Sequence, residues 1–354
     1  MTEHGVPSEP ASVGTRFLGG PRQAASALLG FATAIALWFP ATGSAGEIAR
    51  RQITELKPTA TIRIGNTADW VAIGSGAVWV GSTGPNAVSQ IDPHTNKLIA
   101  SIPLPGNPCA GLALGHGALW VPLCAKPNVL ARVDVHTRRV TLLSGIGPAD
   151  KEGGIASGPD SIWLIVDRRA TLARIDPSSG RIRQIIHVPP GSYNPLYSAG
   201  HIWVTRADGA NVTVVDAATG KISATLRSGP GPRFLTSGAG AVWTLDQGDG
   251  SLTRIDTRTR RVTQTIALNT PGHGGDIKFG GGMVWTTMAK VPLTVIDGNT
   301  GVVLCQWVGA GGDSLGVGHG AIWLTDYEAG TISRIEMSNA LRHCRGNMPR
   351  DEPR

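Results

Sequence analysis

The stretch VAIGSGAVWVGSTGPNAVSQIDPHTN, residues 71–96, decides the fold because its pattern recurs along the chain. It places Trp79 in an apolar run and follows it with a turn that begins at Asp92. The same tryptophan recurs every 38 to 43 residues, at Trp79, Trp120, Trp163, Trp203, Trp243, Trp285 and Trp323. An acid-led turn follows each of them by 12 to 14 residues, at Asp92, Asp134, Asp176, Asp216, Asp256, Asp297 and Glu336. Seven such pairs in one phase indicate a repeat protein of seven units.

Each unit contains four short apolar segments bounded by Gly, Pro, Asn or Asp, which is typical of β-strands. The repeat region shows no helical spacing. Four strands in a unit of about 40 residues predict an all-β fold, a seven-bladed β-propeller with four antiparallel strands per blade. The seventh unit ends one strand early, whereas residues 59–65 precede the first unit as an extra strand. We therefore expect this N-terminal strand to complete blade 7, which closes the ring and removes an open edge.

The turns of the repeat explain two conspicuous histidines. His116 and His319 each stand between glycines, four residues before a Trp, which looks like half a metal site. The equivalent positions in other units share no chemistry and fall at the tip of the hairpin between the first and second strands, so we interpret both histidines as turn residues. In the acid-led turns we expect left-handed backbone four residues after the acid, at Asn96, Arg138, Gly180, Gly220, Arg260, Gly301 and Ala340.

The first residues do not belong to the repeat. Residues 24–39 are apolar, follow Arg16 and Arg22, and precede small residues with a possible cleavage point after Ala45. This pattern predicts a signal peptide over residues 1–45 and a periplasmic or secreted protein with no membrane span after signal removal. An uncleaved anchor is the alternative. We assign residues 46–56 to a linker, 57–344 to the propeller and 345–354 to a disordered C-terminal tail.

Export makes the four cysteines candidates for disulfide bonds. Cys109 precedes the first strand of the second unit and Cys124 follows its second strand, so the two lie at the same end of a hairpin. Cys305 and Cys344 remain as the second pair. The net charge of +7 comes from scattered residues, and no basic stripe with interleaved aromatic residues supports nucleic-acid binding. We expect a monomer.

In a propeller, the loops that enter the first strand and leave the second strand share one face, which we call the mouth. Ligands usually gather there, and the residues at these positions differ from blade to blade, with carboxylates expected on one side and guanidiniums across from them. His273 is a candidate general base or acid with Asp276 or Asp326 nearby, and we nominate His273 and Asp326 as the catalytic residues. Asp313 and Asp326 are candidate ligands for Mg²⁺ or Ca²⁺, which prefer oxygen donors. We predict ligand-binding side chains at Asp69, Asn194, Arg206, Arg233, Asp246 and Asp276.

The unit pattern, Gly-x-Gly-x-hydrophobic-Trp followed by an acid-led turn, resembles the virginiamycin B (streptogramin) lyase-like propellers and the YVTN-type repeat proteins of the periplasm and cell surface. The resemblance covers all seven units. Streptogramin lyases open a macrocyclic ester by elimination with Mg²⁺, using histidines at inner-strand starts and glutamates after the Trp strand. The matching glutamate positions hold Asp326 in WLTD and Asp246 in WTLD, whereas the histidine positions hold Gly275 and Asp313.

Two functions of different class follow. The missing histidines favour an exported, non-catalytic propeller that binds a small molecule, or an exported or cell-envelope protein, on its mouth. The alternative is a metal-assisted lyase or hydrolase of lactone-like esters, with His273 as base and with Asp313 and Asp326 near the metal.

Overall fold

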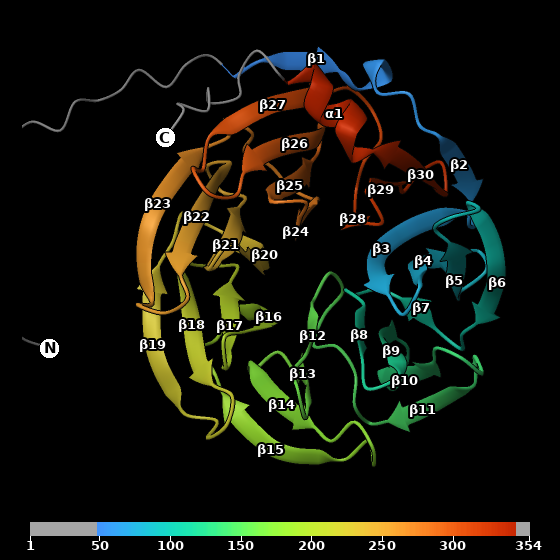
Figure 1. Cartoon of the computed structure of the whole chain (residues 1–354). Helices are drawn as coiled ribbons and strands as arrows, with labels where there is room; N and C mark the ends of the chain where they lie inside the picture. Colours follow the sequence, from blue (N-terminus) through green and yellow to red (C-terminus); the bar gives the residue numbers. More distant parts are fainter. Residues whose placement is uncertain (1–47, 345–354) are drawn as a thin grey trace, which may run out of the picture. The chain divides into compact units, whose positions relative to one another are not determined.

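The computed structural model describes residues 48–344, and Figure 1 shows seven sheets arranged in a ring. Each sheet is one blade, with its first strand at the centre of the ring and its last strand at the periphery. The predicted all-β, seven-bladed propeller with four antiparallel strands per blade is therefore confirmed. The predicted signal peptide and the predicted C-terminal tail lie outside the described residues.

Each blade follows the chain from the centre of the ring outward. Blade 1 comprises β3 (Thr67–Gly74), β4 (Ala77–Thr83), β5 (Ala87–Asp92) and β6 (Lys97–Pro103). Blade 2 comprises β7 (Asn107–Pro108), β8 (Ala113–Gly115), β9 (Ala118–Cys124), β10 (Val129–Asp134) and β11 (Val140–Ser144), and both β7 and β8 pair with β9. Blade 3 comprises β12 (Ile155–Ser157), β13 (Ile162–Ile165), β14 (Thr171–Ile175) and β15 (Ile182–His187). Blade 4 comprises β16 (Ser192–Ser198), β17 (His201–Arg206), β18 (Asn211–Asp216) and β19 (Ile222–Arg227).

The remaining blades follow the same order. Blade 5 comprises β20 (Pro232–Gly238), β21 (Ala241–Asp246), β22 (Ser251–Asp256) and β23 (Arg261–Ala267). Blade 6 contains β24 (Asp276–Gly280), β25 (Met283–Met288), β26 (Val291–Asp297) and β27 (Val303–Val308). Blade 7 contains β28 (Leu315–Gly318), β29 (Ala321–Asp326), β30 (Thr331–Glu336) and, outermost, β2 (Ala60–Arg63).

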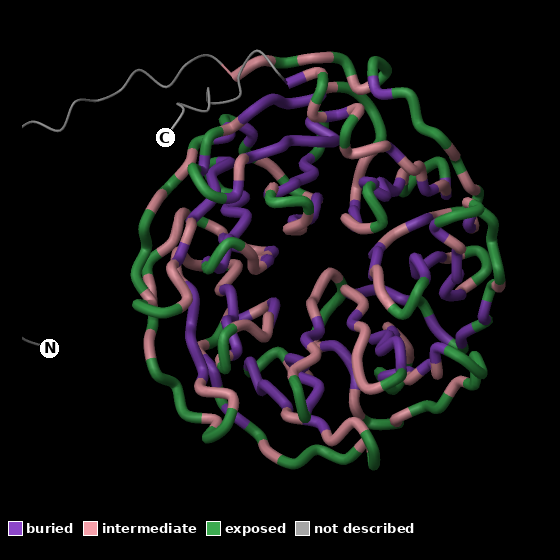
Figure 2. The backbone as a smooth tube through the Cα atoms, viewed as in Figure 1, coloured by how far each residue is buried: buried purple, intermediate pink, exposed green. Residues whose placement is uncertain are grey.

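The repeated tryptophans form the core between blades. Each of these side chains is at most 1% exposed, because a neighbouring blade packs against the strand that carries it. Trp79 of blade 1, for example, packs in one cluster with Leu119 and Val121 of blade 2. Figure 2 shows the same division, with buried strands inside each blade and exposed residues along the peripheral strands. Apolar contact between successive blades therefore holds the ring together.

The ring closes through the N-terminal strand, as the sequence predicts. β2 pairs antiparallel with β30, and Ala60 lies opposite Arg334 while Arg63 lies opposite Thr331. Outside this ladder, Thr59 N donates to Arg334 O at 2.8 Å and Ile64 N donates to Gly330 O at 2.8 Å. A strand near the start of the described chain and a strand near its end thus share one sheet, which removes an open edge.

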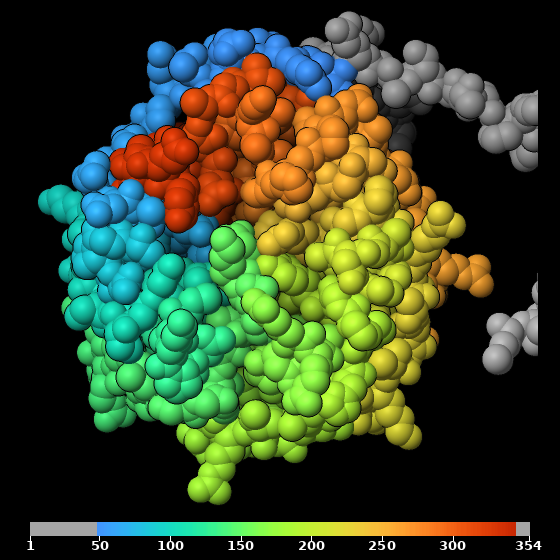
Figure 3. Space-filling model, turned by 180° about the vertical axis from the view of Figure 1, so that it is seen from behind, coloured from blue at the N-terminus to red at the C-terminus, as the bar shows by residue number. Residues whose placement is uncertain are grey.

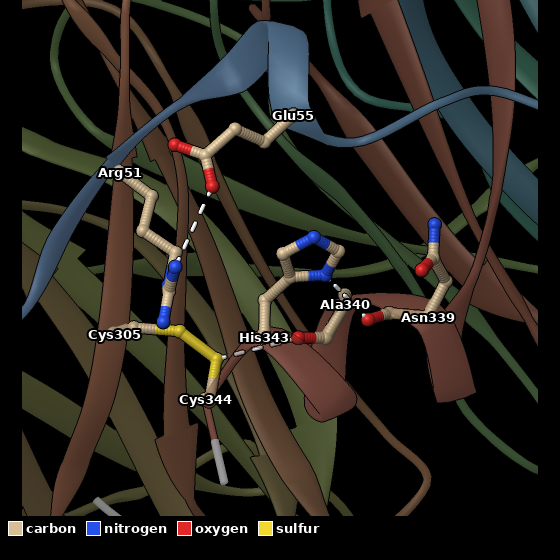
Figure 4. The surroundings of a disulfide bond; sticks show 7 residues. All are labelled: Arg51, Glu55, Cys305, Asn339, Ala340, His343 and Cys344. Atoms are coloured by element: carbon tan, nitrogen blue, oxygen red, sulfur yellow. Dashed lines mark hydrogen bonds and ion pairs between the residues drawn. A yellow bond between two sulfur atoms is a disulfide. The ribbon is translucent and has the colours of Figure 1, made fainter. Parts of the chain in front are cut away.

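Blade 6 has a fifth strand that the sequence did not indicate. Within the segment assigned to a linker, β1 (Arg50–Gln52) pairs in parallel with β27, and a short 3₁₀ helix, η1 (Ile53–Glu55), follows it. The C-terminal helix α1 (Met337–His343) ends beside the same blade, where Cys344 is disulfide-bonded to Cys305 of β27 (Figure 4). Both ends of the described chain are therefore attached to blade 6.

The backbone at the turns confirms most of the predicted left-handed positions. His116 and His319 have φ values of 55° and 52°, as expected for turn residues. The positions four residues after the acid have φ between 54° and 77° in blades 1 to 6. The prediction was wrong in blade 7, because Ala340 lies in α1 and Glu336 is the residue before that helix. The disulfide between Cys109 and Cys124 is confirmed, as is the one between Cys305 and Cys344.

Candidate functional site

The mouth is the face where the first strand of each blade begins beside the end of the second strand. In blade 1, Thr67 lies opposite Thr83, and in blade 6, Asp276 lies opposite Thr287. The segment near residue 150, which leads into blade 3, reaches toward the centre of the ring (Figure 3, bright green). The loops that enter neighbouring blades therefore converge near the centre of this face.

Asp69 and Asp313 form a carboxyl pair at the junction of blades 1 and 7. Asp69 lies in β3, and Asp313 lies two residues before β28. Burial raises the pKa of Asp69 well above its ordinary value, and the negative charge of Asp313 raises this pKa further. Burial also raises the pKa of Asp313. The contact between the two side chains raises the pKa of Asp69 and lowers that of Asp313, so a proton shared by the pair is held mainly by Asp69.

Glu152 adds a third carboxyl group to this pair. It precedes β12 on the loop that enters blade 3, is half-buried, and has a left-handed φ of 66°. Its pKa is raised, first by burial and then by the charge of Asp313. Among the described residues, none of Asp69, Glu152 and Asp313 forms an ion pair with a Lys, Arg or His. The charges of Arg233 and Lys151 act on Glu152 and lower its pKa, but neither forms an ion pair with it. The mouth thus contains an acidic cluster, defined here as these three residues, that has no direct ion-pair partner among the described residues.

Asp276 lies beside this cluster but is already paired. Its buried carboxylate accepts hydrogen bonds from Lys278 Nζ at 2.6 Å on both oxygens and from Ser314 Oγ at 2.8 Å. The Ile277 backbone N–H donates to it at 2.7 Å. Asp276 therefore joins blades 6 and 7, and Lys278 balances its charge.

Arg233 and Asn194 lie at the starts of the inner strands of blades 5 and 4. The Arg233 guanidinium donates to Tyr193 Oη at 2.8 Å and lies 4.5 Å from the centre of the Tyr193 ring. Asn194 is 3% exposed, and its Nδ2 donates to Arg233 O at 2.8 Å. The contact with that carbonyl fixes the orientation of the amide, so Asn194 Oδ1 is the acceptor that has no partner among the described residues.

Asp246 and Arg206, which the sequence also nominated for ligand binding, make contacts within their own blades. Asp246 is fully buried inside blade 5, where it accepts hydrogen bonds from Thr253 Oγ1 at 2.6 Å and Thr244 Oγ1 at 2.7 Å. Arg206 pairs with Asp208 at 2.8 Å. Of the two guanidiniums predicted to lie across from the carboxylates, Arg233 acts on the acidic cluster, where its charge lowers the pKa of Glu152. Arg206 pairs within its own loop.

The residues predicted for catalysis and metal binding do not form a common centre. His273 is exposed, and no hydrogen bond joins it to Asp276 or Asp326 among residues 48–344. Asp326 accepts a hydrogen bond from the Ala329 backbone N–H at 2.9 Å, while its charge acts on the nearby Asp313. Within the described part of the chain, no group of three or more His, Cys, Asp or Glu side chains is arranged to hold a metal ion.

A cavity of about 190 Å³ lies among the inner strands, close to their mouth ends. Trp70 of blade 1 and Phe234 of blade 5 line it and are in contact with each other, with ring centroids 5.9 Å apart and planes inclined by 57°. Trp70 follows Asp69 and has a left-handed φ of 52°, and its backbone N–H donates to Asp69 Oδ1 at 2.7 Å. The same irregularity of β3, between Asp69 and Val71, therefore places one carboxyl in the acidic cluster and one aromatic ring in the cavity.

Sequence reasoning missed Glu152, Tyr193, Trp70 and Phe234. Trp70 carried a signal, since it lies outside the repeated tryptophan phase and directly follows a nominated residue. Phe234 follows Arg233 in the same way. Glu152 carried none, because it lies in an irregular loop whose path depends on packing between blades.

No family model and no curated protein matches this chain. Among solved structures, BamB from Moraxella catarrhalis is similar, with a TM-score of 0.56 and 12% sequence identity. The match covers 80% of this chain and 100% of the BamB chain. At this identity the likeness shows the fold alone, and the narrower resemblance to streptogramin lyases and YVTN repeats stays a prediction. Within residues 48–344, no helix has the length and apolar character needed to cross a bilayer.

Proposed function

We propose that this protein is an exported, non-catalytic binding propeller whose mouth recognises a positively charged group. That group is an amine of a small molecule or a Lys or Arg side chain of a protein partner. The observation that carries the proposal is the acidic cluster, in which Asp69, Glu152 and Asp313 come from three blades and have no ion-pair partner among the described residues.

The physical argument rests on the cost of burying charge. Carboxyl groups withdrawn from water repel one another, and their raised pKa values record that cost. Arg233 and Lys151 act on Glu152 without forming an ion pair with it. A bound cation would supply a countercharge in direct contact, in a site of low dielectric where the attraction is stronger than in water. The cluster is also local, since the chain as a whole has a net charge of +7. A cationic ligand is therefore attracted to the mouth rather than to the rest of the surface.

The non-catalytic assignment follows from the placement of His273. A general base must lie within hydrogen-bond reach of the reacting proton and be held there by its neighbours. His273 is exposed, and neither Asp276 nor Asp326 orients it through a hydrogen bond in the described part of the chain. Export is supported by the two disulfides, which persist in oxidising compartments.

The test is a calorimetric titration of the full chain with two probes. Spermidine represents a small-molecule amine, and a tetralysine peptide represents basic side chains of a protein. Glu152→Gln keeps the shape of the cluster and removes one charge, and the matched control is Asp208→Asn, at an exposed carboxylate outside the cluster.

We expect Glu152→Gln to weaken binding of the preferred probe by about tenfold, since a charge pair in a partly buried site contributes more than 1 kcal/mol. The control should bind as the wild type does. The probe that binds more tightly identifies the source of the cation. Equal affinities of wild type and Glu152→Gln for both probes, or no binding of either, would overturn the proposal.

A further inference from the structure

We propose that the central cavity is a second binding subsite, which takes a small, flat, uncharged ligand group bearing both a hydrogen-bond donor and an acceptor, such as an aromatic carboxamide. The proposal goes beyond cation recognition at the mouth, because it concerns the space among the inner strands and does not depend on the acidic cluster.

The size and walls of the cavity define the shape of the ligand. Its volume is about 190 Å³, somewhat more than the roughly 150 Å³ of an engineered apolar cavity that binds benzene. Trp70 and Phe234 pack against each other and provide one aromatic wall, and Leu112 and Leu196 also line the space. Aromatic rings pack favourably in offset or inclined arrangements on such walls. One six-membered ring with a short substituent therefore fits.

Two buried polar atoms define the chemistry of the ligand. Asn194 Oδ1 is an acceptor without a partner among the described residues, and the side chain is 3% exposed. Trp70 Nε1 is a donor without a partner in the same part of the chain, and this side chain is 5% exposed. Both residues line the cavity. An unpaired buried polar group destabilises the protein, so a ligand group that offers one donor and one acceptor is favoured there.

The cavity carries little net charge of its own. Asp276 and Lys278 both line it, and they neutralise each other through contacts of 2.6 Å. A charged ligand group would lack a free countercharge in this cavity. A neutral amide can form hydrogen bonds with Asn194 and Trp70 without the cost of desolvating an ion. This distinguishes the central subsite from the acidic cluster at the mouth.

Two glycines keep the space open. Gly111 and Gly154 line the cavity, and neither has a left-handed φ that would demand glycine. A Cβ at Gly111 would lie 3.8 Å from Trp70 Cε3 and 3.6 Å from Gly154 Cα, which is ordinary contact. A Cβ at Gly154 would lie 2.6 Å from Asn194 Oδ1 and would displace that amide. Gly111→Ala therefore narrows the cavity without straining the backbone.

The test uses benzamide as the probe and toluene as the same ring without hydrogen-bonding atoms. Both are titrated into the full chain and followed by ligand-observed NMR. Asn194→Leu removes the acceptor while retaining side-chain volume, and Gly111→Ala narrows the cavity. The matched control for the glycine is Gly153→Ala, whose Cβ would meet only Asp150 O at 3.4 Å and which does not line the central cavity.

We expect saturable benzamide binding with one site per chain, weakened at least about fivefold by Asn194→Leu, the loss of one hydrogen bond. Toluene binding should persist in that variant, which shows that the cavity is intact. Gly111→Ala should weaken both probes, whereas Gly153→Ala and Asp208→Asn, at an exposed carboxylate outside both sites, should leave benzamide affinity within about twofold. If benzamide does not bind saturably, the cavity holds water only and the proposal is overturned. Equal benzamide affinities of wild type and Asn194→Leu would also overturn it.

Discussion

Asp246 in β21 provides a quantitative test of how blade 5 is built. Its carboxylate is fully buried and accepts hydrogen bonds from Thr253 Oγ1, Thr244 Oγ1 and the Gly229 backbone N–H. Burial outweighs these donors and raises the pKa of Asp246 from 3.8 to about 6. Asp246→Asn preserves the shape of the side chain and removes its titration.

The sign and size of the effect follow from that shift. Because the folded pKa is the higher one, the native state binds the proton more tightly than the unfolded state does. The contribution of Asp246 to stability is therefore complete below about pH 4 and is lost as the pH rises through about 6. Two pH units at 1.36 kcal/mol each correspond to a loss of about 3 kcal/mol. Asp246→Asn should lack this loss, so its stability relative to wild type should rise by about 3 kcal/mol between pH 4 and pH 7.

Urea unfolding monitored by tryptophan fluorescence at several pH values from 4 to 7 measures this difference. Other titrating groups, including Asp69 and Asp313, are common to both proteins and cancel in the comparison. Asp208→Asn, at an exposed carboxylate in the neighbouring blade, serves as the control and should run parallel to wild type. Parallel curves for wild type and Asp246→Asn would refute the reasoning, because they would show that the hydrogen-bond donors fully offset burial.

Three further predictions concern the blades and the mouth. Replacing Cys109 and Cys124 by Ser should lower the free energy of unfolding by about 3 kcal/mol, measured without reductant, because their disulfide closes a loop with a sequence separation of 15. An unchanged value would show that the hairpin alone fixes this loop. Trp203→Ala should cost about 3–5 kcal/mol in the same assay, since the side chain is fully buried between blades, and a loss under 1 kcal/mol would contradict that packing. Binding of spermidine should release a proton from Asp69, seen as a binding enthalpy that depends on the ionisation heat of the buffer, and buffer-independent heats would argue against the shared proton.

The sequence by itself determined the number of blades, the strand content of each blade and the way in which the ring closes. These features are local and periodic, because Trp79 and its six equivalents must be buried and the acid-led turns of blades 1 to 6 satisfy their own backbone. The sequence also identified His116 and His319 as turn residues and not as metal ligands. Their left-handed φ values at the hairpin tips agree with that interpretation. The prediction failed at Ala340, where the chain leaves the repeat and forms α1 in place of a turn.

Only the tertiary structure decided which polar side chains of the mouth act together. Asp246 and Asp326 occupy equivalent positions after their tryptophans, yet one is sealed inside blade 5 and the other is only half-buried, near Asp313. Glu152 joins Asp69 and Asp313 because the loop entering blade 3 reaches toward the centre of the ring. The physical reason is that repeat periodicity specifies contacts within a blade and to its neighbours, whereas charge pairing and cavities at the centre depend on how all seven blades meet.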